Sequence, residues 1–111
     1  MLFTEALKDS KVFSRLYKKG RFVANDSIVA YFMPNRLPVT RLGITAGKKL
    51  GNAVTRNRAK RILREAYRQS EMKLPIGYDI VLVAREGIKE KKTQELYGFF
   101  HRLAKEMNKA K

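Results

Sequence analysis

Residues 51–68 read GNAVTRNRAKRILREAYR, with five arginines, one lysine and a single acid at Glu65. Asn52 suits a helix N-cap, and no glycine or proline interrupts the chain from there to Gln69. At 100° per residue, the apolar side chains of this segment fall within one arc of roughly 140°. They are Ala59, Ile62, Leu63, Ala66 and Tyr67. The stretch therefore predicts an amphipathic helix over residues 52–69, with its apolar face against a sheet.

The opposite side of this helix is strongly basic. It carries Asn57, Arg58, Lys60, Arg61, Arg64 and Arg68, whereas Arg56 projects onto the apolar arc. With Lys48 and Lys49 just before the helix, residues 48–68 contribute +7 to the net charge of +15. Like charges at Lys60/Arg64 and Arg64/Arg68 repel at the i,i+4 spacing, unlike the mixed charges of an ordinary solvated helix. A polyanion would relieve this repulsion, which favours nucleic-acid binding over a merely solvated face.

The composition of the whole chain narrows the class of protein. The 111 residues fit one compact domain, and an apolar share of 44% argues against disorder. No apolar run approaches the roughly 20 residues that span a bilayer. The N-terminal MLFTEALKDS lacks the features of a signal peptide, and the absence of cysteine excludes disulfides and cysteine-based zinc sites. We expect one cytoplasmic domain over residues 1–111, with its core at about residues 8–105 and no membrane partner.

The remaining segments predict the other layers of an α+β fold. The expected elements are a helix between Ser10 and Gly20, strands over residues 27–33, 41–46 and 78–84, and a helix over residues 93–107. The first two strands, separated by turn residues, are expected to form an antiparallel pair. The third, YDIVLVA, is apolar on both faces and suits a buried strand. The predicted order is α-β-β-α-β-α in a single-domain α-β sandwich.

Two other functions are less well supported. A DNA-binding helix-turn-helix needs a partner helix just upstream, where the sequence has a predicted strand followed by GKKLG, so no DNA partner is expected. A metal-dependent nuclease needs two or three converging carboxylates. Asp79 and Glu90 are the nearest approach to such a set, and His101 is the only histidine. We therefore expect no catalytic residue in this chain.

The run LGITAGKKLGNAVTRNRAKRILREAYR, residues 42–68, closely resembles the signature of the protein subunit of bacterial ribonuclease P. The matching features are Arg-Asn-Arg at residues 56–58, Gly-Lys-Lys at residues 47–49 and Lys-Arg at residues 60–61. Outside the run, the likeness extends to Phe13, Tyr17, Tyr31 and the late strand YDIVLVAR. It covers about residues 8–105.

This resemblance implies a fold and a function. The family folds as an α-β sandwich with a left-handed βαβ crossover through the basic helix, against the usual right-handed rule. Its members are not themselves the nuclease. They bind a catalytic RNA that uses Mg²⁺ to remove the 5′ leader of precursor tRNA, so the holoenzyme is an endoribonuclease. For the protein itself, the carboxylates specify no metal site.

The resemblance also assigns residues to two binding surfaces. The residues implied for leader binding are Phe13, Tyr17, Tyr31, Lys48 and Lys49. Those implied for binding the catalytic RNA are Arg56, Asn57, Arg58, Lys60, Arg61, Arg64 and Arg68. A ribosomal or ribosome-assembly protein with a similar sandwich is the alternative. The Arg-Asn-Arg signature and the matched aromatic positions favour the ribonuclease P subunit.

Overall fold

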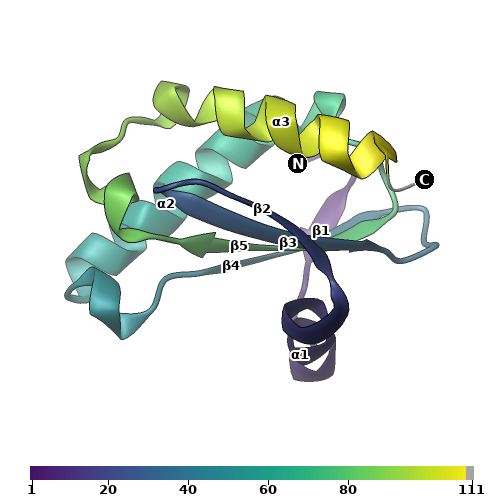
Figure 1. Ribbon diagram of the computed structural model, residues 1–111, viewed down its shortest axis with the longest axis horizontal. Coiled ribbons are helices and arrows are strands. Elements are labelled where there is room, and N and C mark those ends of the chain that lie inside the picture. The colour runs from purple at the N-terminus through teal and green to yellow at the C-terminus, as the bar shows by residue number, and fades with distance from the viewer. Residues whose placement is uncertain (110–111) are drawn as a thin grey trace.

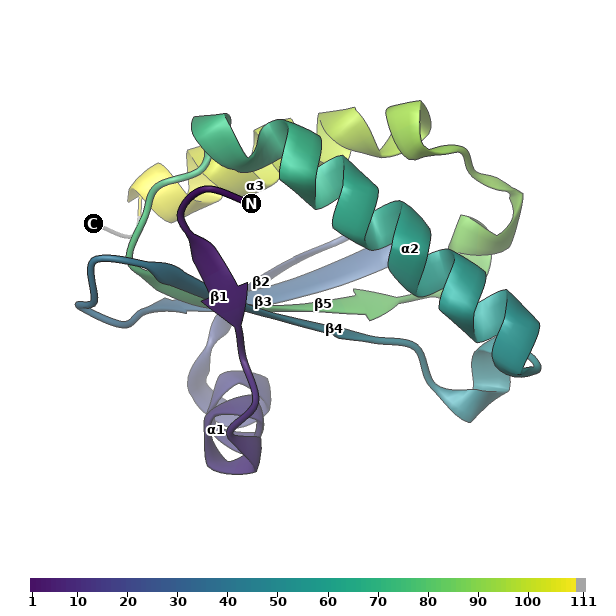
Figure 2. The ribbon, with the colours of Figure 1, turned by 180° about the vertical axis from the view of Figure 1, so that it is seen from behind.

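The computed structural model, described over residues 1–109, contains a five-stranded sheet with helices on both faces (Figures 1 and 2). Its strands are β1 (Thr4–Ala6), β2 (Arg21–Ala24), β3 (Ile28–Pro34), β4 (Thr40–Thr45) and β5 (Tyr78–Ala84). Its helices are α1 (Ser10–Lys19), α2 (Ala53–Ser70) and α3 (Tyr97–Lys109). Helix α1 covers one face of the sheet, and α2 and α3 cover the other. The predicted α+β sandwich is confirmed, with two short strands, β1 and β2, added to the predicted elements.

The strand order, β1-β4-β5-β3-β2, corrects one prediction. Strands β3 and β4 run antiparallel but are not neighbours, because β5 lies between them, parallel to β4 and antiparallel to β3. The expected pairing of residues 27–33 with residues 41–46 is therefore wrong. The physical reason is that β5 is apolar on both faces, and the centre of the sheet is where both faces are covered.

Helix α2 connects the parallel neighbours β4 and β5 by a left-handed crossover. In Figure 2, β4 runs to the right, α2 returns to the left above the sheet, and β5 runs to the right again behind β4. This path turns anticlockwise as it recedes from the viewer. The hand agrees with the family resemblance and differs from the usual hand of such connections.

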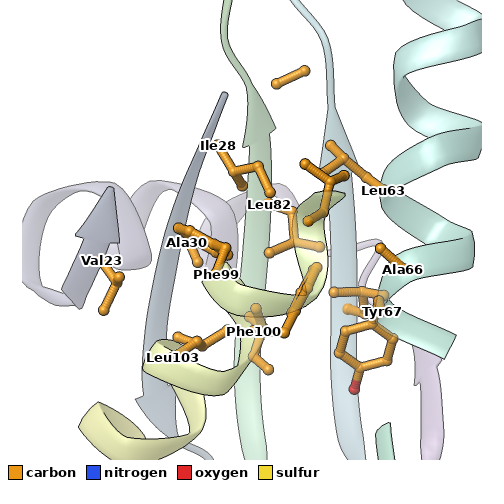
Figure 3. Close-up of a cluster of buried hydrophobic side chains, with 14 of the residues drawn as sticks. Val23, Ile28, Ala30, Leu63, Ala66, Tyr67, Leu82, Phe99, Phe100 and Leu103 are labelled. Atoms are coloured by element: carbon orange, nitrogen blue, oxygen red, sulfur yellow. The ribbon is translucent and has the colours of Figure 1, made fainter. Parts of the chain in front are cut away.

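The apolar side of α2 forms the main core with β3, β5 and α3 (Figure 3). All five residues of the predicted apolar arc are buried. The Asn52 side chain caps the helix by accepting a hydrogen bond from the Thr55 amide at 3.0 Å. Near the C-terminal end of α3, the Met107 carbonyl accepts a hydrogen bond from the Tyr78 hydroxyl at 2.7 Å. None of the helices within residues 1–109 combines the length and apolarity needed to cross a bilayer.

A buried carboxylate anchors the strand β1, which the sequence pattern did not predict. Glu71, only 6% exposed, accepts hydrogen bonds from the amides of Leu2 and Phe3 at 2.8 and 3.1 Å and from the Thr4 hydroxyl. Burial acts to raise the pKa of Glu71, but these three hydrogen bonds, together with the positive charge of the N-terminus, outweigh burial and hold the pKa below its ordinary value of 4.5. Glu71 therefore fastens β1 beside the C-terminal end of α2.

We predict that Glu71→Gln lowers the free energy of unfolding by about 1–3 kcal/mol at neutral pH, because three donors at β1 lose a buried charged acceptor. The folded-state pKa is depressed, so this stabilisation is present above the unfolded-state pKa and is lost as the pH falls through the folded-state pKa. The difference from wild type should narrow below about pH 4.5 in urea titrations. Glu90→Gln, at an exposed position, is the control. A difference that stays constant in acid would contradict this role for Glu71.

Candidate nucleic-acid interface

The outer side of α2 presents the basic residues as the sequence predicted. Asn57, Arg61, Arg64 and Arg68 are exposed and Lys60 is half-buried. At 100° per residue these five positions share an arc of roughly 100°. Because the opposite side of α2 lies against the sheet, the stripe faces away from the core. Within residues 1–109, Arg61 and Arg64 form no hydrogen bond or ion pair with another side chain.

Two of the predicted basic residues already have partners inside the protein. Arg58 donates to the carbonyl oxygens of Lys89 and Lys91 at 3.3 and 3.1 Å, so it fastens the segment before α3 to α2. Arg68 forms an ion pair with Glu65 at 2.5 Å. Hydrogen bonds from Arg68 and Gln69 lower the pKa of Glu65 to about 2, so this carboxylate remains charged at neutral pH. On the outer side of α2, Lys60, Arg61 and Arg64 are therefore the basic residues without an internal side-chain or carbonyl partner within residues 1–109.

Arg56 lies on the predicted apolar arc of α2, near the start of the helix. The side chain is half-buried, and its Nε is a buried donor without a hydrogen-bond partner in the described part of the chain. A buried donor without a partner costs free energy, typically about 1–3 kcal/mol. The position of Arg56 on the predicted apolar arc thus buries part of a charged side chain in the folded protein.

An aromatic row lies on the opposite face of the sheet, where α1 packs. It consists of Phe13 and Tyr17 from α1, Tyr31 from β3 and Phe22 from β2. The ring centroids are 6.5 Å apart for Phe13 and Tyr17, 5.1 Å for Tyr17 and Tyr31, and 5.9 Å for Tyr31 and Phe22. The structure therefore brings together all three predicted aromatic residues. Phe22 was missed, because β2 was not recognised as a strand and its pairing with β3 is not visible in the sequence.

Helix α1 divides its apolar residues between the core and this row. Val12 and Leu16 are buried, whereas Phe13 is half-buried and Tyr17 is 45% exposed. The Phe13 ring rests on β4 at Gly43, where a Cβ atom would lie within 2.7 Å of Phe13 Cε1 and even closer to its Cζ. Glycine at this position therefore makes room for the ring.

A cavity of 490 Å³ joins the aromatic row to α2 around the edge of the sheet. Strand β1 pairs with β4 only as far as Leu42, which leaves the edge of β4 open from Gly43 onward. Phe13, Gly43 and Ile44 line the cavity together with Arg64 of α2. The two predicted surfaces thus meet at this edge.

The two predicted lysines lie beyond the end of β4. Lys48 and Lys49 are exposed in a short 3-10 turn, Lys48–Leu50, that leads from β4 toward α2. The turn is anchored by Leu50, which is buried in the main core. Both lysines are therefore held in the connection between β4 and α2, with their side chains exposed.

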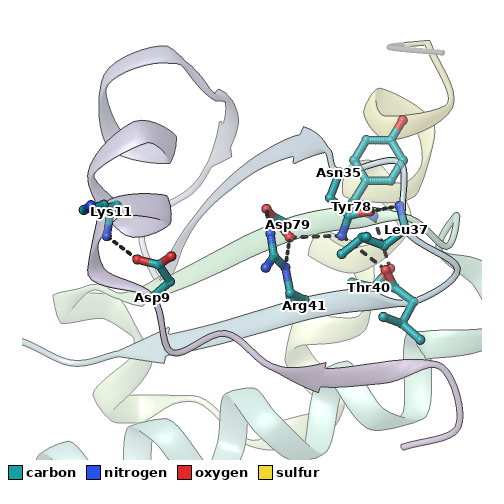
Figure 4. Close-up of polar contacts among 9 residues, drawn as sticks. Asp9, Lys11, Asn35, Leu37, Thr40, Arg41, Tyr78 and Asp79 are labelled. Carbon is teal, nitrogen blue, oxygen red and sulfur yellow. Dashed lines mark hydrogen bonds and ion pairs between the residues drawn. The ribbon is translucent and has the colours of Figure 1, made fainter.

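The carboxylates of the described residues do not assemble into a metal-binding group. Asp79 is buried and accepts two hydrogen bonds of 2.7 Å from Arg41 and one of 3.0 Å from Asn35 (Figure 4). The hydrogen bond to Asp79 raises the pKa of Arg41, against the opposing effect of burial. Glu90 is exposed in the segment that follows β5. Within residues 1–109, no group of three or more histidine, aspartate or glutamate side chains is arranged to hold a metal ion.

A basic helix and an aromatic row on opposite faces of one sheet define a small nucleic-acid-binding protein. A family model described as Ribonuclease P matches residues 1–108, and the chain belongs to this family. The ribonuclease P protein component of Lachnoclostridium phytofermentans is 43% identical over 102 residues, which cover 92% of this chain and 88% of that protein. That of Caldanaerobacter subterraneus is 49% identical over 84 residues, 76% of this chain and 72% of that protein.

A solved structure gives the same family. The ribonuclease P protein from Thermotoga maritima matches with a TM-score of 0.80 and 29% identity, over 92% of this chain and 96% of that one. Membership of this family makes the chain part of the ribonuclease P holoenzyme, which cleaves tRNA precursors, and implies association with the ribonuclease P RNA. These comparisons support the ribonuclease P interpretation, and none of them favours the ribosomal alternative.

We predict that Gly43→Ala displaces the Phe13 ring while the fold is kept, because the new methyl group overlaps a half-buried side chain that can swing outward. The free energy of unfolding should fall by about 1–3 kcal/mol, as for other overpacked sites. Nuclear Overhauser effects between the Phe13 ring and β4 report the displacement. Gly98→Ala is the control, because a Cβ atom there meets nothing within 4 Å. If the nuclear Overhauser effects between the Phe13 ring and β4 are unchanged in Gly43→Ala, Gly43 does not position the ring.

Proposed function

We propose that this chain holds two RNAs on opposite faces of its sheet. The outer side of α2 docks on the catalytic RNA, and the aromatic row receives the single-stranded 5′ leader of precursor tRNA. The observation that carries the proposal is the division of chemistry between the faces. Arginine and lysine dominate the outer side of α2, whereas aromatic rings gather on the α1 face.

The outer side of α2 suits a folded RNA because its arginines are free to bind phosphates. The planar guanidinium fork matches two phosphate oxygens at once. Arg61 and Arg64 supply the most available forks, with Lys60 and Asn57 beside them. Arg58 contributes in a second way, since its hydrogen bonds to the carbonyl groups of residues 89 and 91 hold a neighbouring segment in place. Arg68 and Arg56 lie at the ends of this docking surface.

The aromatic row suits an unpaired strand because every base has a flat face that stacks on a ring. Each base stacked on an aromatic side chain contributes about 1–3 kcal/mol. Phe13, Tyr17 and Tyr31 provide such faces, and Lys48 and Lys49 neutralise the leader phosphates near the edge of β4. The substrate in this proposal is precursor tRNA, and the difference from mature tRNA is the leader itself.

Catalysis in this proposal belongs to the RNA partner. Mg²⁺ supplies a Lewis acid and an activated water for phosphodiester hydrolysis when it is bound by that RNA. The described residues of this chain offer no carboxylate cluster that fits a catalytic metal, so the protein contributes binding and charge neutralisation. A cytoplasmic location fits these partners, because bacteria synthesise tRNA precursors in the cytoplasm.

The leader surface predicts a selective loss of affinity. In the reconstituted holoenzyme, Phe13→Ala combined with Tyr31→Ala should weaken precursor tRNA binding at least about tenfold, because two stacking platforms are removed. Binding of mature tRNA should stay the same. Equilibrium binding of both RNAs in Ca²⁺, which supports folding of the RNAs with little cleavage, gives the comparison. Equal losses for both RNAs would contradict a leader surface.

The docking surface predicts a change in salt dependence. Arg61→Gln combined with Arg64→Gln should weaken binding to the ribonuclease P RNA and reduce the slope of log K against log salt by about 0.7–0.9 for each phosphate that the protein no longer neutralises. Arg68→Gln is the matched control, since Glu65 already neutralises Arg68 and its slope should change less. Binding is measured over a salt titration. If the slope is unaltered in the protein with both substitutions, these arginines face solvent in the complex.

A further inference from the structure

Phe22 is the most exposed aromatic residue of the row, and no predicted role accounts for it. The residue is 64% exposed, although its side chain lies on the same face of the sheet as α1. It is the cross-strand partner of Tyr31, with the two ring centroids 5.9 Å apart. An exposed phenylalanine in contact with a binding-site tyrosine offers a flat apolar surface that folding has not used.

The register of the sheet aligns Phe22 with the proposed leader site. Gly43, Val81, Tyr31 and Phe22 are successive partners across β4, β5, β3 and β2, so they form one line on the α1 face. Figure 2 shows α1 nearly end-on beneath the strands, so its axis also crosses them. The aromatic row therefore runs across the sheet, from Phe13 over β4 to Phe22 on the edge strand β2.

The two ends of the row differ in their surroundings. At the β4 end, Phe13 shares the 490 Å³ cavity with Arg64 of α2. At the β2 end, Phe22 follows Lys18 and Lys19, which are exposed in the last turn of α1. If α2 docks on the catalytic RNA, the leader nucleotides nearest the cleavage site lie at the Phe13 end. Nucleotides farther upstream then extend toward Phe22.

We propose that Phe22 is a fourth stacking platform, which binds the leader base farthest from the cleavage site, with Lys18 and Lys19 beside the adjoining phosphates. This inference rests on the proposed leader surface. Its consequence is a preference for precursors whose leaders are long enough to cross the whole row. Phe22 is a specificity-determining residue here, since it touches the substrate without contributing to the chemical step.

The test uses holoenzyme reconstituted with the ribonuclease P RNA and precursor tRNAs whose leaders lengthen one nucleotide at a time. Affinity in Ca²⁺ is measured for wild type, Phe22→Ala, Phe22→Leu and Phe22→Tyr, with Phe3→Ala as the control for an exposed phenylalanine outside the row. Thermal unfolding of each variant checks that the fold is retained. Phe22→Ala should bind short-leader precursors like wild type and should bind roughly 5- to 150-fold more weakly only with leaders that reach β2.

The substitution series separates stacking from simple contact. Phe22→Tyr keeps an aromatic face and should retain the affinity for long leaders, whereas Phe22→Leu should not. If Phe22→Ala keeps the wild-type dependence on leader length while Phe13→Ala with Tyr31→Ala abolishes it, the leader surface stands and the inference about Phe22 is overturned. If neither variant alters the dependence on leader length, the proposed leader surface itself is overturned. A loss of affinity that is equal at every leader length also overturns the role for Phe22.

Discussion

The arrangement of this protein depends on the burial of β5 at the centre of its sheet. Every residue of β5 except Val83 is buried, and the strand alternates its side chains between two separate apolar clusters. Ile80 and Leu82 face the core beneath α2 and α3, whereas Val81 faces α1. A strand that is apolar on both faces requires a cover on each, and the two covers are made by different helices. The two faces can therefore present different chemistry to solvent.

The crossover helix α2 places a set of basic residues on one side of the sheet. The apolar side of α2 is fixed on the sheet, so its arginines and lysines must point outward. Internal partners engage two of these side chains, since Glu65 neutralises Arg68 and two carbonyl groups hold Arg58 in place. Among the outer residues of α2, Arg64 meets the cavity beside Phe13 at the edge of β4. In a chain with a net charge of +15, an arginine of α2 that is unpaired within the described residues thus lies at the junction of the two proposed RNA surfaces.

The sequence predicted those features that depend on residues close to one another in the chain. The cap at Asn52 and the buried arc of α2 follow from local chemistry and helical period. The position of Phe13 and Tyr17 outside the core was expected only from the family resemblance. The pairing of β3 with β5 did not follow, because a strand's alternation identifies its faces but not its partner. Strand β1 depends on Glu71, some seventy residues away in the sequence, and the use of Arg58 depends on carbonyl groups about thirty residues away. Phe22 was missed for the same reason, since it joins the aromatic row only through its pairing with β3.

The central claim is that the two faces hold two different RNAs, and site-specific crosslinking tests it most directly. The chain has no cysteine, so Asn57→Cys on α2 and Thr45→Cys on the α1 face of β4 each create a single site for a photoreactive label. In holoenzyme with precursor tRNA, the label at position 57 should attach to the catalytic RNA whether or not substrate is present. The label at position 45 should attach to the 5′ leader and lose that product when mature tRNA replaces the precursor. Attachment of both labels to the same RNA would contradict the account.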